Sequence, residues 1–324
     1  MSEEQPAPAV PVLPRIAVLI PCYNEELTIA AVVAGFRAEL PQADIHVFDN
    51  NSTDRTVELA AAAGARVSHE PRQGKGYVVQ SMFRKVEADV YVLVDGDGTY
   101  PADAVHRLLA PLLAGQADMV IGTRLHPAAQ SAFRPLNRLG NLLFRRLLNG
   151  IFGVRVTDLL SGYRVFSRRL VRGVPLFGGG FETETEMTIK SLALGFTVVE
   201  VPVDLGRRPA GSHSKIRLVH DGWLILSTIL NLCRDYRPLT FFGWLGLGTI
   251  ASSLLPGIWV LADFLRTGQV LRLPSAILAV GLVLMGVMFL VLGVLLHTIS
   301  RRFYELSFQI QTLADELRQQ DRSG

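Results

Sequence analysis

The chain has 324 residues, of which 49% are apolar and 19% charged, so it can bury a full catalytic core and still build further segments. Its net charge of +3 is too small to indicate nucleic-acid binding without a concentrated basic face, and no DNA-reading motif is present. The mean hydropathy of +0.30 is high for a soluble protein and comes mostly from the last third of the chain. The two cysteines, Cys22 and Cys233, form neither a metal-type pair nor a disulfide framework, which favours a reducing, cytoplasmic setting.

Strand and helix patterns alternate along the first part of the chain. Residues 1–14 are acidic and rich in Pro and Ala, which predicts a disordered tail rather than a signal peptide. Apolar, β-branched runs then predict strands at 15–21, 44–48, 66–69, 90–94 and 118–122, and helices in a segment ending at Leu40, at 52–63 and at 76–86. This alternation predicts an α/β domain with a mostly parallel sheet and helices on both faces.

Two carboxylates follow the strand at 90–94. Asp95 and Asp97 stand one residue apart, and two acids held so close repel each other unless a cation lies between them. Hard carboxylate oxygens suit Mg²⁺ or Mn²⁺, which proteins commonly hold with one or two acids plus substrate phosphates. The alternative is a polar turn that closes the strand, because Asp and Gly are ordinary turn residues.

Polar residues also follow two other predicted strands. Asn24 and Glu25 come after the first strand and Asp49 after the second. In open parallel sheets the ligand lies beyond the carboxyl ends of the strands, so these residues and the Asp95–Asp97 pair are expected to meet in one crevice.

A basic, leucine-rich segment lies at 133–152. Its arginines, which include Arg138, predict an amphipathic helix with a basic face. A membrane surface or a lipid phosphate would suit such a helix, but a surface helix with solvated arginines explains the pattern as well.

The last third of the chain holds two charge-free runs, 239–261 and 277–299. At about 1.5 Å per residue, each is long enough to cross the ~30 Å hydrocarbon core of a bilayer. We expect a transmembrane hairpin preceded by an interfacial amphipathic helix at 218–236 and followed by a cytoplasmic helix at 300–324. The Lys- and Arg-rich domain before the hairpin favours both hairpin ends in the cytoplasm.

Seven sequence motifs occur in order along the chain, beginning with Pro21-Cys-Tyr-Asn-Glu25, Asp49-Asn-Asn-Ser-Thr-Asp54, Gly74-Lys-Gly76 and Asp95-Gly-Asp97. Thr157-Asp-Leu-Leu-Ser-Gly-Tyr-Arg164, Phe181-Glu-Thr-Glu184 and a basic stretch at 208–215 follow. With the two spans, they resemble glycosyltransferase family 2, and in particular the polyprenyl-phosphate sugar transferases related to dolichol-phosphate mannose synthase. The resemblance implies a GT-A (Rossmann-like) catalytic domain at 15–217.

The resemblance also implies a donor site for a UDP- or GDP-sugar. Its nucleotide-sugar contacts would be Pro21, Tyr23, Asn24, Glu25, Asp49, Asn51, Lys75 and Asp95. Asp95 and Asp97 would hold Mg²⁺ or Mn²⁺ on the diphosphate. Many relatives carry a Gln at the position of Thr99, and a hydroxyl is a poorer ligand, so water would take that place. Gly74-Lys-Gly76 lacks the Ser or Thr and the first Gly of a Walker loop, which excludes a P-loop ATPase.

On the acceptor side, the resemblance implies that the phosphate of a polyprenyl lipid binds Arg124, Arg138, Arg208, Ser214 and Lys215. The catalytic residues would be Asp97, Asp158 and Glu184. Asp158 or Glu184 would orient the acceptor or stabilise charge on the sugar, and the alternative is a helix cap or a pair with Arg164.

These inferences predict metal-dependent, inverting hexose transfer to a polyprenyl phosphate by an integral membrane enzyme with its catalytic domain in the cytoplasm, as in a bacterial inner membrane. Two other hypotheses are a processive polysaccharide synthase and a nucleotide-sugar-binding membrane scaffold without catalysis. The absence of a Gln-x-x-Arg-Trp sequence and the small number of spans argue against the synthase. Whether the protein is a homo-oligomer stays open.

Overall fold

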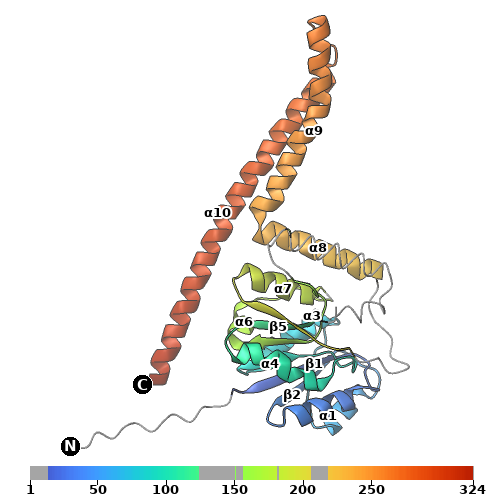
Figure 1. Ribbon diagram of the computed structural model, residues 1–324, viewed down its shortest axis with the longest axis vertical. Coiled ribbons are helices and arrows are strands. Elements are labelled where there is room, and N and C mark those ends of the chain that lie inside the picture. The colour runs from blue at the N-terminus through green and yellow to red at the C-terminus, as the bar shows by residue number, and fades with distance from the viewer. Residues whose placement is uncertain (1–13, 124–149, 151–155, 181, 206–217, 324) are drawn as a thin grey trace, which may run out of the picture. The chain divides into compact units, whose positions relative to one another are not determined.

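The protein is described from a computed structural model that covers residues 14–123, 150, 156–180, 182–205 and 218–323. The chain divides into two compact units, 1–228 and 229–324. Figure 1 shows the helices and strands of both units.

The first unit is built on a seven-stranded sheet of order β3-β2-β1-β4-β6-β5-β7. Its strands are β1 (Ile16–Cys22), β2 (Asp44–Asp49), β3 (Arg66–His69), β4 (Val90–Leu93), β5 (Met119–Thr123), β6 (Arg164–Ser167) and β7 (Val198–Pro202). β6 runs antiparallel to both β4 and β5, and the other pairs are parallel. The expected mostly parallel sheet is therefore confirmed.

Helices cover both faces of this sheet (Figure 1). Side chains alternate across a strand, so Val18 and Ile20 of β1 join one hydrophobic core while Ala17 and Leu19 join the other. The first core contains residues of α1 (Ile29–Glu39), α2 (Thr56–Ala62) and α4 (Val105–Leu113), which follows a 3₁₀ turn at Ala102–Ala104. The second core contains residues of α3 (Lys75–Lys85), α6 (Arg168–Gly173) and α7 (Thr183–Ala193).

One helix begins later than the pattern predicted. The expected helix at 52–63 begins at Thr56, because the Asp54 carboxylate accepts hydrogen bonds from the backbone N–H and the hydroxyl of Thr56 at 3.0 and 2.5 Å. Asp54 therefore closes a turn ahead of the helix. The expected basic helix at 133–152 lies outside the described residues except at position 150.

The helix α8 (Leu218–Tyr236) has the bounds expected for the amphipathic segment. In its C-terminal half, Ile229, Leu232 and Cys233 are buried, whereas Trp223 is 70% exposed. Buried and exposed apolar side chains on one helix are consistent with an amphipathic surface, and its membrane location stays a prediction.

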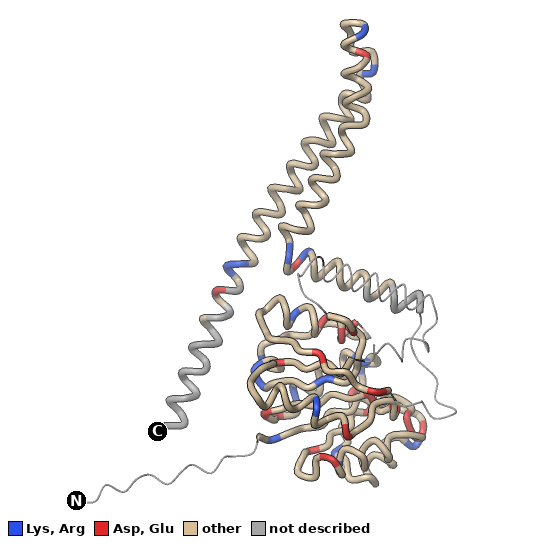
Figure 2. Tube along the Cα trace, in the orientation of Figure 1, with Lys and Arg blue, Asp and Glu red and all other residues tan. Residues whose placement is uncertain are grey.

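The second unit contains the end of α8 and an antiparallel pair of long helices, α9 (Pro238–Thr267) and α10 (Leu273–Ser323). Two segments, Pro238–Thr267 and Leu273–Phe303, are each long and apolar enough to cross a membrane. Only 11% of an apolar 18-residue stretch in each segment is buried within the protein. Figure 2 shows charged residues at the two ends of these segments and none along their shared length. The expected hairpin is present.

Close backbone contact holds the two helices together. A side chain at Gly246 would meet the carbonyl oxygen of Gly286, and one at Gly286 would meet the carbonyl of Gly246. α10 is a single helix of 51 residues, so the separate helix expected at 300–324 is instead its continuation. Arg301 and Arg302 end the apolar run but do not interrupt the backbone hydrogen bonds of a helix.

Candidate active site

The carboxyl ends of β1, β2 and β4 meet at one edge of the sheet. Cys22 and Asp49 end β1 and β2 and are paired in register, and Asp95 and Asp97 follow β4. We call the residues after these three strand ends the strand-end site. The sheet therefore brings together the groups that the sequence placed in one crevice.

The loops after β1 and β2 are joined by side chains. The backbone N–H of Asn24 donates to Ser52 Oγ at 2.9 Å, and Asn24 Oδ1 accepts the backbone N–H of Thr53 at 2.8 Å. Glu25 N–H donates to Thr56 Oγ1 at 2.8 Å. Asn24 adopts a left-handed conformation with φ 51°, which Asn tolerates better than most residues. The structure thus gives Asn24 a bracing role, and its contact with a nucleotide stays a prediction.

Asn51 also braces a loop. It is left-handed, with φ 64°, and its Nδ2 donates to the Pro71 carbonyl and to Gln73 Oε1, each at 3.0 Å. Nearby, Asp49 accepts the Ser52 N–H at 3.2 and 3.3 Å on its two carboxylate oxygens. Hydrogen bonds of Asp49 and Asn51 therefore hold the turn that follows β2.

Asp97 forms a tight turn with Thr99. Its Oδ1 accepts the Thr99 backbone N–H at 3.0 Å and the Thr99 hydroxyl at 2.6 Å. The Thr99 hydroxyl therefore orients the Asp97 carboxylate in this structure.

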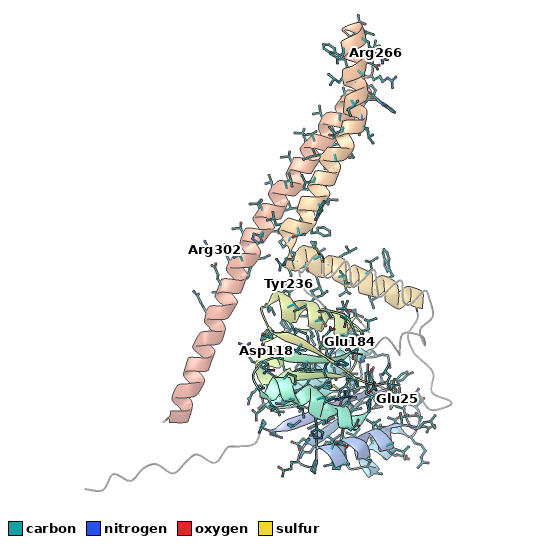
Figure 3. The ribbon with its side chains drawn as sticks, viewed as in Figure 1. Glu25, Asp118, Glu184, Tyr236, Arg266 and Arg302 are labelled. Atoms are coloured by element: carbon teal, nitrogen blue, oxygen red, sulfur yellow. The ribbon has the colours of Figure 1, made fainter. Side chains whose placement is uncertain are left out.

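Asp95 lies in a buried ion cluster with Lys75 and Glu184. Lys75 Nζ is 2.6 Å from Asp95 Oδ1 and 2.5 Å from Glu184 Oε1, and Lys75 and Glu184 are only 13% and 4% exposed (Glu184 is labelled in Figure 3). Burial alone would lower the pKa of Lys75, but the two carboxylates outweigh it and raise this pKa above its ordinary value. Lys75 is therefore a permanent cation between an acid that follows β4 and an acid of α7.

The glycines on either side of Lys75 allow this placement. Gly76 N–H donates to the Gly179 carbonyl at 3.1 Å, and a side chain at Gly76 would collide with the Gly178 carbonyl and the Thr183 hydroxyl. Gly74 has φ 137°, which L residues rarely adopt. The Gly-Lys-Gly motif therefore brings the glycine loop (residues 174–180) against the first turn of α3.

The segment 157–164 closes the site from β6. Gly162 lies so close to the Asp95 carboxylate that a side chain there would overlap Asp95 Oδ2. Arg164 is fully buried, and its guanidinium donates to the Leu159 and Ser161 carbonyls at 2.7 and 2.8 Å. Asp158 is 1% exposed and accepts the Leu160 N–H at 3.3 Å. Its expected catalytic role stays a prediction.

The carboxylates of Asp95 and Asp97 fit a divalent cation, because their oxygens are hard ligands. In the part of the chain that the structure describes, no group of three or more His, Cys, Asp or Glu is arranged to hold a metal ion. A cation bound here would thus take its other ligands from a diphosphate and from water, as Mg²⁺ usually does.

All five expected acceptor residues lie outside the described residues: Arg124, Arg138, Arg208, Ser214 and Lys215. Two contacts in this unit were not predicted from the sequence. His69 ends β3 and contacts Asp49, and Glu200 on β7 accepts the backbone N–H groups of Thr157 and Asp158 at 2.8 and 3.1 Å. The end of the predicted strand at 66–69 could have indicated His69, whereas Glu200 depends on a strand that the patterns did not reveal.

Comparisons with known proteins agree with this geometry. The family model of "Glycosyl transferase family 2" matches residues 17–174. The chain is also 33% identical over 305 residues to "Glycosyltransferase AglJ" of Haloferax volcanii. The matched region covers 94% of this chain and 100% of AglJ. The chain belongs to glycosyltransferase family 2. It is therefore a hexosyltransferase with a GT-A fold.

Two further similarities concern substrates of other proteins. The transferase is 31% identical to the "Dolichyl-phosphate hexose transferase" of Haloferax volcanii, over 68% of this chain and 95% of that one. It also resembles the glucosyl-3-phosphoglycerate synthase of Mycobacterium tuberculosis, solved with Mn²⁺, UDP and glucosyl-3-phosphoglycerate. That similarity has a TM-score of 0.58 and 26% identity, and it covers 68% of this chain and 80% of that one.

Proposed function

We propose that this glycosyltransferase moves a hexose from a UDP- or GDP-sugar to a polyprenyl phosphate in the membrane, with inversion at the anomeric carbon. The observation that carries the proposal is the presence, in one chain of this family, of acids gathered in the strand-end site and of two helices of membrane-spanning length. These helices would anchor the enzyme in the bilayer, which an acceptor of this kind never leaves. The similarity to a dolichyl-phosphate hexose transferase supports the same acceptor class.

On the donor side, we propose that Asp95 and Asp97 hold Mg²⁺ or Mn²⁺. Mn²⁺ and UDP in the glucosyl-3-phosphoglycerate synthase support this choice. A cation there would offset the negative charge that grows on the departing nucleoside diphosphate. Pro21, Tyr23, Glu25 and Asp49 would line the nucleotide pocket, together with Asn24, Asn51 and Lys75.

On the acceptor side, positioning should dominate the chemistry. A lipid phosphate is already ionised at neutral pH, so it needs no strong base before it attacks the sugar. Asp158 and Glu184 would orient the reacting groups, and Glu184 is itself held by Lys75. The basic residues Arg124, Arg138, Arg208, Ser214 and Lys215 would bind the phosphate.

The membrane arrangement is part of the proposal. We place both ends of the α9–α10 hairpin and the catalytic unit in the cytoplasm, because Lys and Arg are enriched on that side of membrane proteins. The nucleotide sugar would then reach the site from the cytoplasm.

The test is hexose transfer by the purified full chain in detergent. Labelled UDP- and GDP-hexoses are offered with undecaprenyl phosphate and Mn²⁺, and the product is extracted and treated with mild acid. A lipid-linked single hexose that mild acid releases, and that disappears with EDTA, supports the proposal. Asp97→Ala should abolish transfer, whereas Asp103→Ala, an exposed acid nearby, should not. A long polymer would instead indicate a synthase, and nucleotide binding without turnover would indicate a scaffold.

A further inference from the structure

A histidine stands beside the expected nucleotide pocket. His69 ends β3 and is paired in register with Asp49 at the end of β2, so both side chains lie on one face of the sheet. Its Nδ1 is 3.2 Å from Asp49 Oδ2. The side chain of Asp49 is 5% exposed and that of His69 is 57% exposed. The pair therefore has a buried half and a half that a ligand can reach.

The buried Asp49 carboxylate limits the hydrogen-bonding roles of the two ring nitrogens of His69. Asp49 is held by the Ser52 N–H on both of its oxygens, so its carboxylate has a defined orientation. A neutral imidazole that donates Nδ1–H to this carboxylate keeps its other nitrogen as a hydrogen-bond acceptor. When Nδ1 carries the ring proton, Nε2 can accept a hydrogen bond from a ligand group that carries an N–H, because the roles of the two ring nitrogens depend on the tautomer.

The order of the strands sets the distance between this pair and the metal ligands. Asp95 and Asp97 follow β4, and β1 and β2 lie between β4 and β3. At about 4.8 Å per strand, β3 is roughly 14 Å from β4. A nucleoside whose diphosphate is held after β4, and which extends along this edge past Asp49, an expected nucleotide contact, would reach the end of β3.

We propose that His69 contacts the nucleobase of the donor, with Asp49 as the residue that positions it. The inference rests on the proposed function. Uracil and guanine each carry a ring N–H that can donate to Nε2 of His69. Cytosine carries an unprotonated ring nitrogen at the matching position, which would face Nε2 acceptor to acceptor. His69 thus selects UDP- or GDP-sugars over CDP-sugars.

The test is equilibrium binding of UDP, GDP, CDP and pyrophosphate to the full chain in detergent with Mn²⁺. In the unmodified protein, the tighter of UDP and GDP should bind about tenfold or more tightly than CDP, the difference expected when a hydrogen bond is replaced by two facing acceptors. His69→Ala should bring this ratio to within about threefold, by loss of affinity for UDP or GDP, and leave pyrophosphate binding unchanged.

The matched control is His106→Ala. His106 is an exposed histidine whose Nε2 is 3.0 Å from Glu39, so it is a similar pair in another part of the unit. This variant should bind all four ligands as the unmodified protein does. An unchanged nucleotide ratio in His69→Ala, or an equal loss of pyrophosphate binding, would overturn the role of His69. Absence of binding by every nucleotide to the folded, unmodified protein would overturn the proposed function as well.

Discussion

At the scale of single residues, the Lys75 cluster is the most consequential feature of the strand-end site. Lys75 is a cation that offsets charge on Asp95, which follows β4, and on Glu184 of α7. Removal of one partner from a buried ion pair leaves an uncompensated charge and typically costs about 3–5 kcal/mol. Lys75→Met should therefore lower the free energy of unfolding by about this amount, which thermal unfolding in detergent would detect as a clear drop in midpoint.

The matched control for Lys75 is Glu87→Ala. Glu87 pairs with Arg172 at 2.6 Å, but its side chain is 64% exposed, so its loss should change stability by about 0.5 kcal/mol or less. A Lys75→Met protein as stable as the unmodified one would show that the cluster does not neutralise buried charge.

A second residue-scale prediction concerns acid. The Arg72 guanidinium, which donates to Glu70 Oε1 at 2.9 Å, outweighs burial and lowers the pKa of Glu70 from 4.5 to about 2. Because the folded-state pKa is the lower one, this contribution to stability is complete above pH 4.5 and is lost as the pH falls toward 2. The unfolding midpoint should fall across this window, and Glu70→Gln should reduce the slope. An identical slope in Glu70→Gln would contradict the assignment.

The sequence indicated which polar residues lie at the strand ends but not the contacts that they make. Asp49, Asp95 and Asp97 could be predicted because each follows an apolar run at a strand end. The pairing of Lys75 with Glu184 could not, because it joins residues far apart in the sequence through the packing of α3 against the glycine loop. Local patterns contain no signal for such a contact.

At the scale of elements, the contact between α3 and the glycine loop determines where Lys75 lies. Gly76→Ala would drive its new methyl group into the Gly178 carbonyl and the Thr183 hydroxyl. Overpacking of this kind costs about 1–3 kcal/mol, and it should also separate Lys75 from Glu184. The midpoint of thermal unfolding and the affinity for nucleotide should both fall. Gly248→Ala, where nothing lies within 4 Å of the added carbon, should change neither; equal behaviour of the two variants would contradict the packing argument.

Elements with regular apolar patterns were predicted from the sequence. Two strands were missed: β6, which contains a buried charged residue, and β7, which is only partly buried. β1 to β4 and their helices follow clear apolar periodicities. β6 was missed because its buried strand begins with Arg164, whose guanidinium donates to the Leu159 and Ser161 carbonyls and to the Thr188 hydroxyl on α7. β7 was missed because its side chains are only partly buried and its pairing with β5 is non-local.

At the scale of the whole molecule, the proposed topology places the turn between α9 and α10 outside the cytoplasm. Both native cysteines are buried, so an introduced cysteine can be labelled with little background. A membrane-impermeant maleimide added to intact cells should label Gln269→Cys at the turn. Glu305→Cys, beyond the second span, should be labelled only after permeabilisation. The reverse pattern would contradict the cytoplasmic location of the catalytic unit.

The central claim is that Asp95 and Asp97 bind a divalent cation together with a nucleoside diphosphate. The most direct measurement is electron paramagnetic resonance of Mn²⁺ with the full chain, with and without UDP or GDP. Asp97→Asn is the sharpest variant, because it keeps the Oδ1 acceptor for Thr99 but removes the charge. We predict nucleotide-dependent Mn²⁺ binding by the unmodified protein and its loss in Asp97→Asn at an unchanged unfolding midpoint. Equal Mn²⁺ binding by both proteins in the presence of nucleotide would contradict the claim.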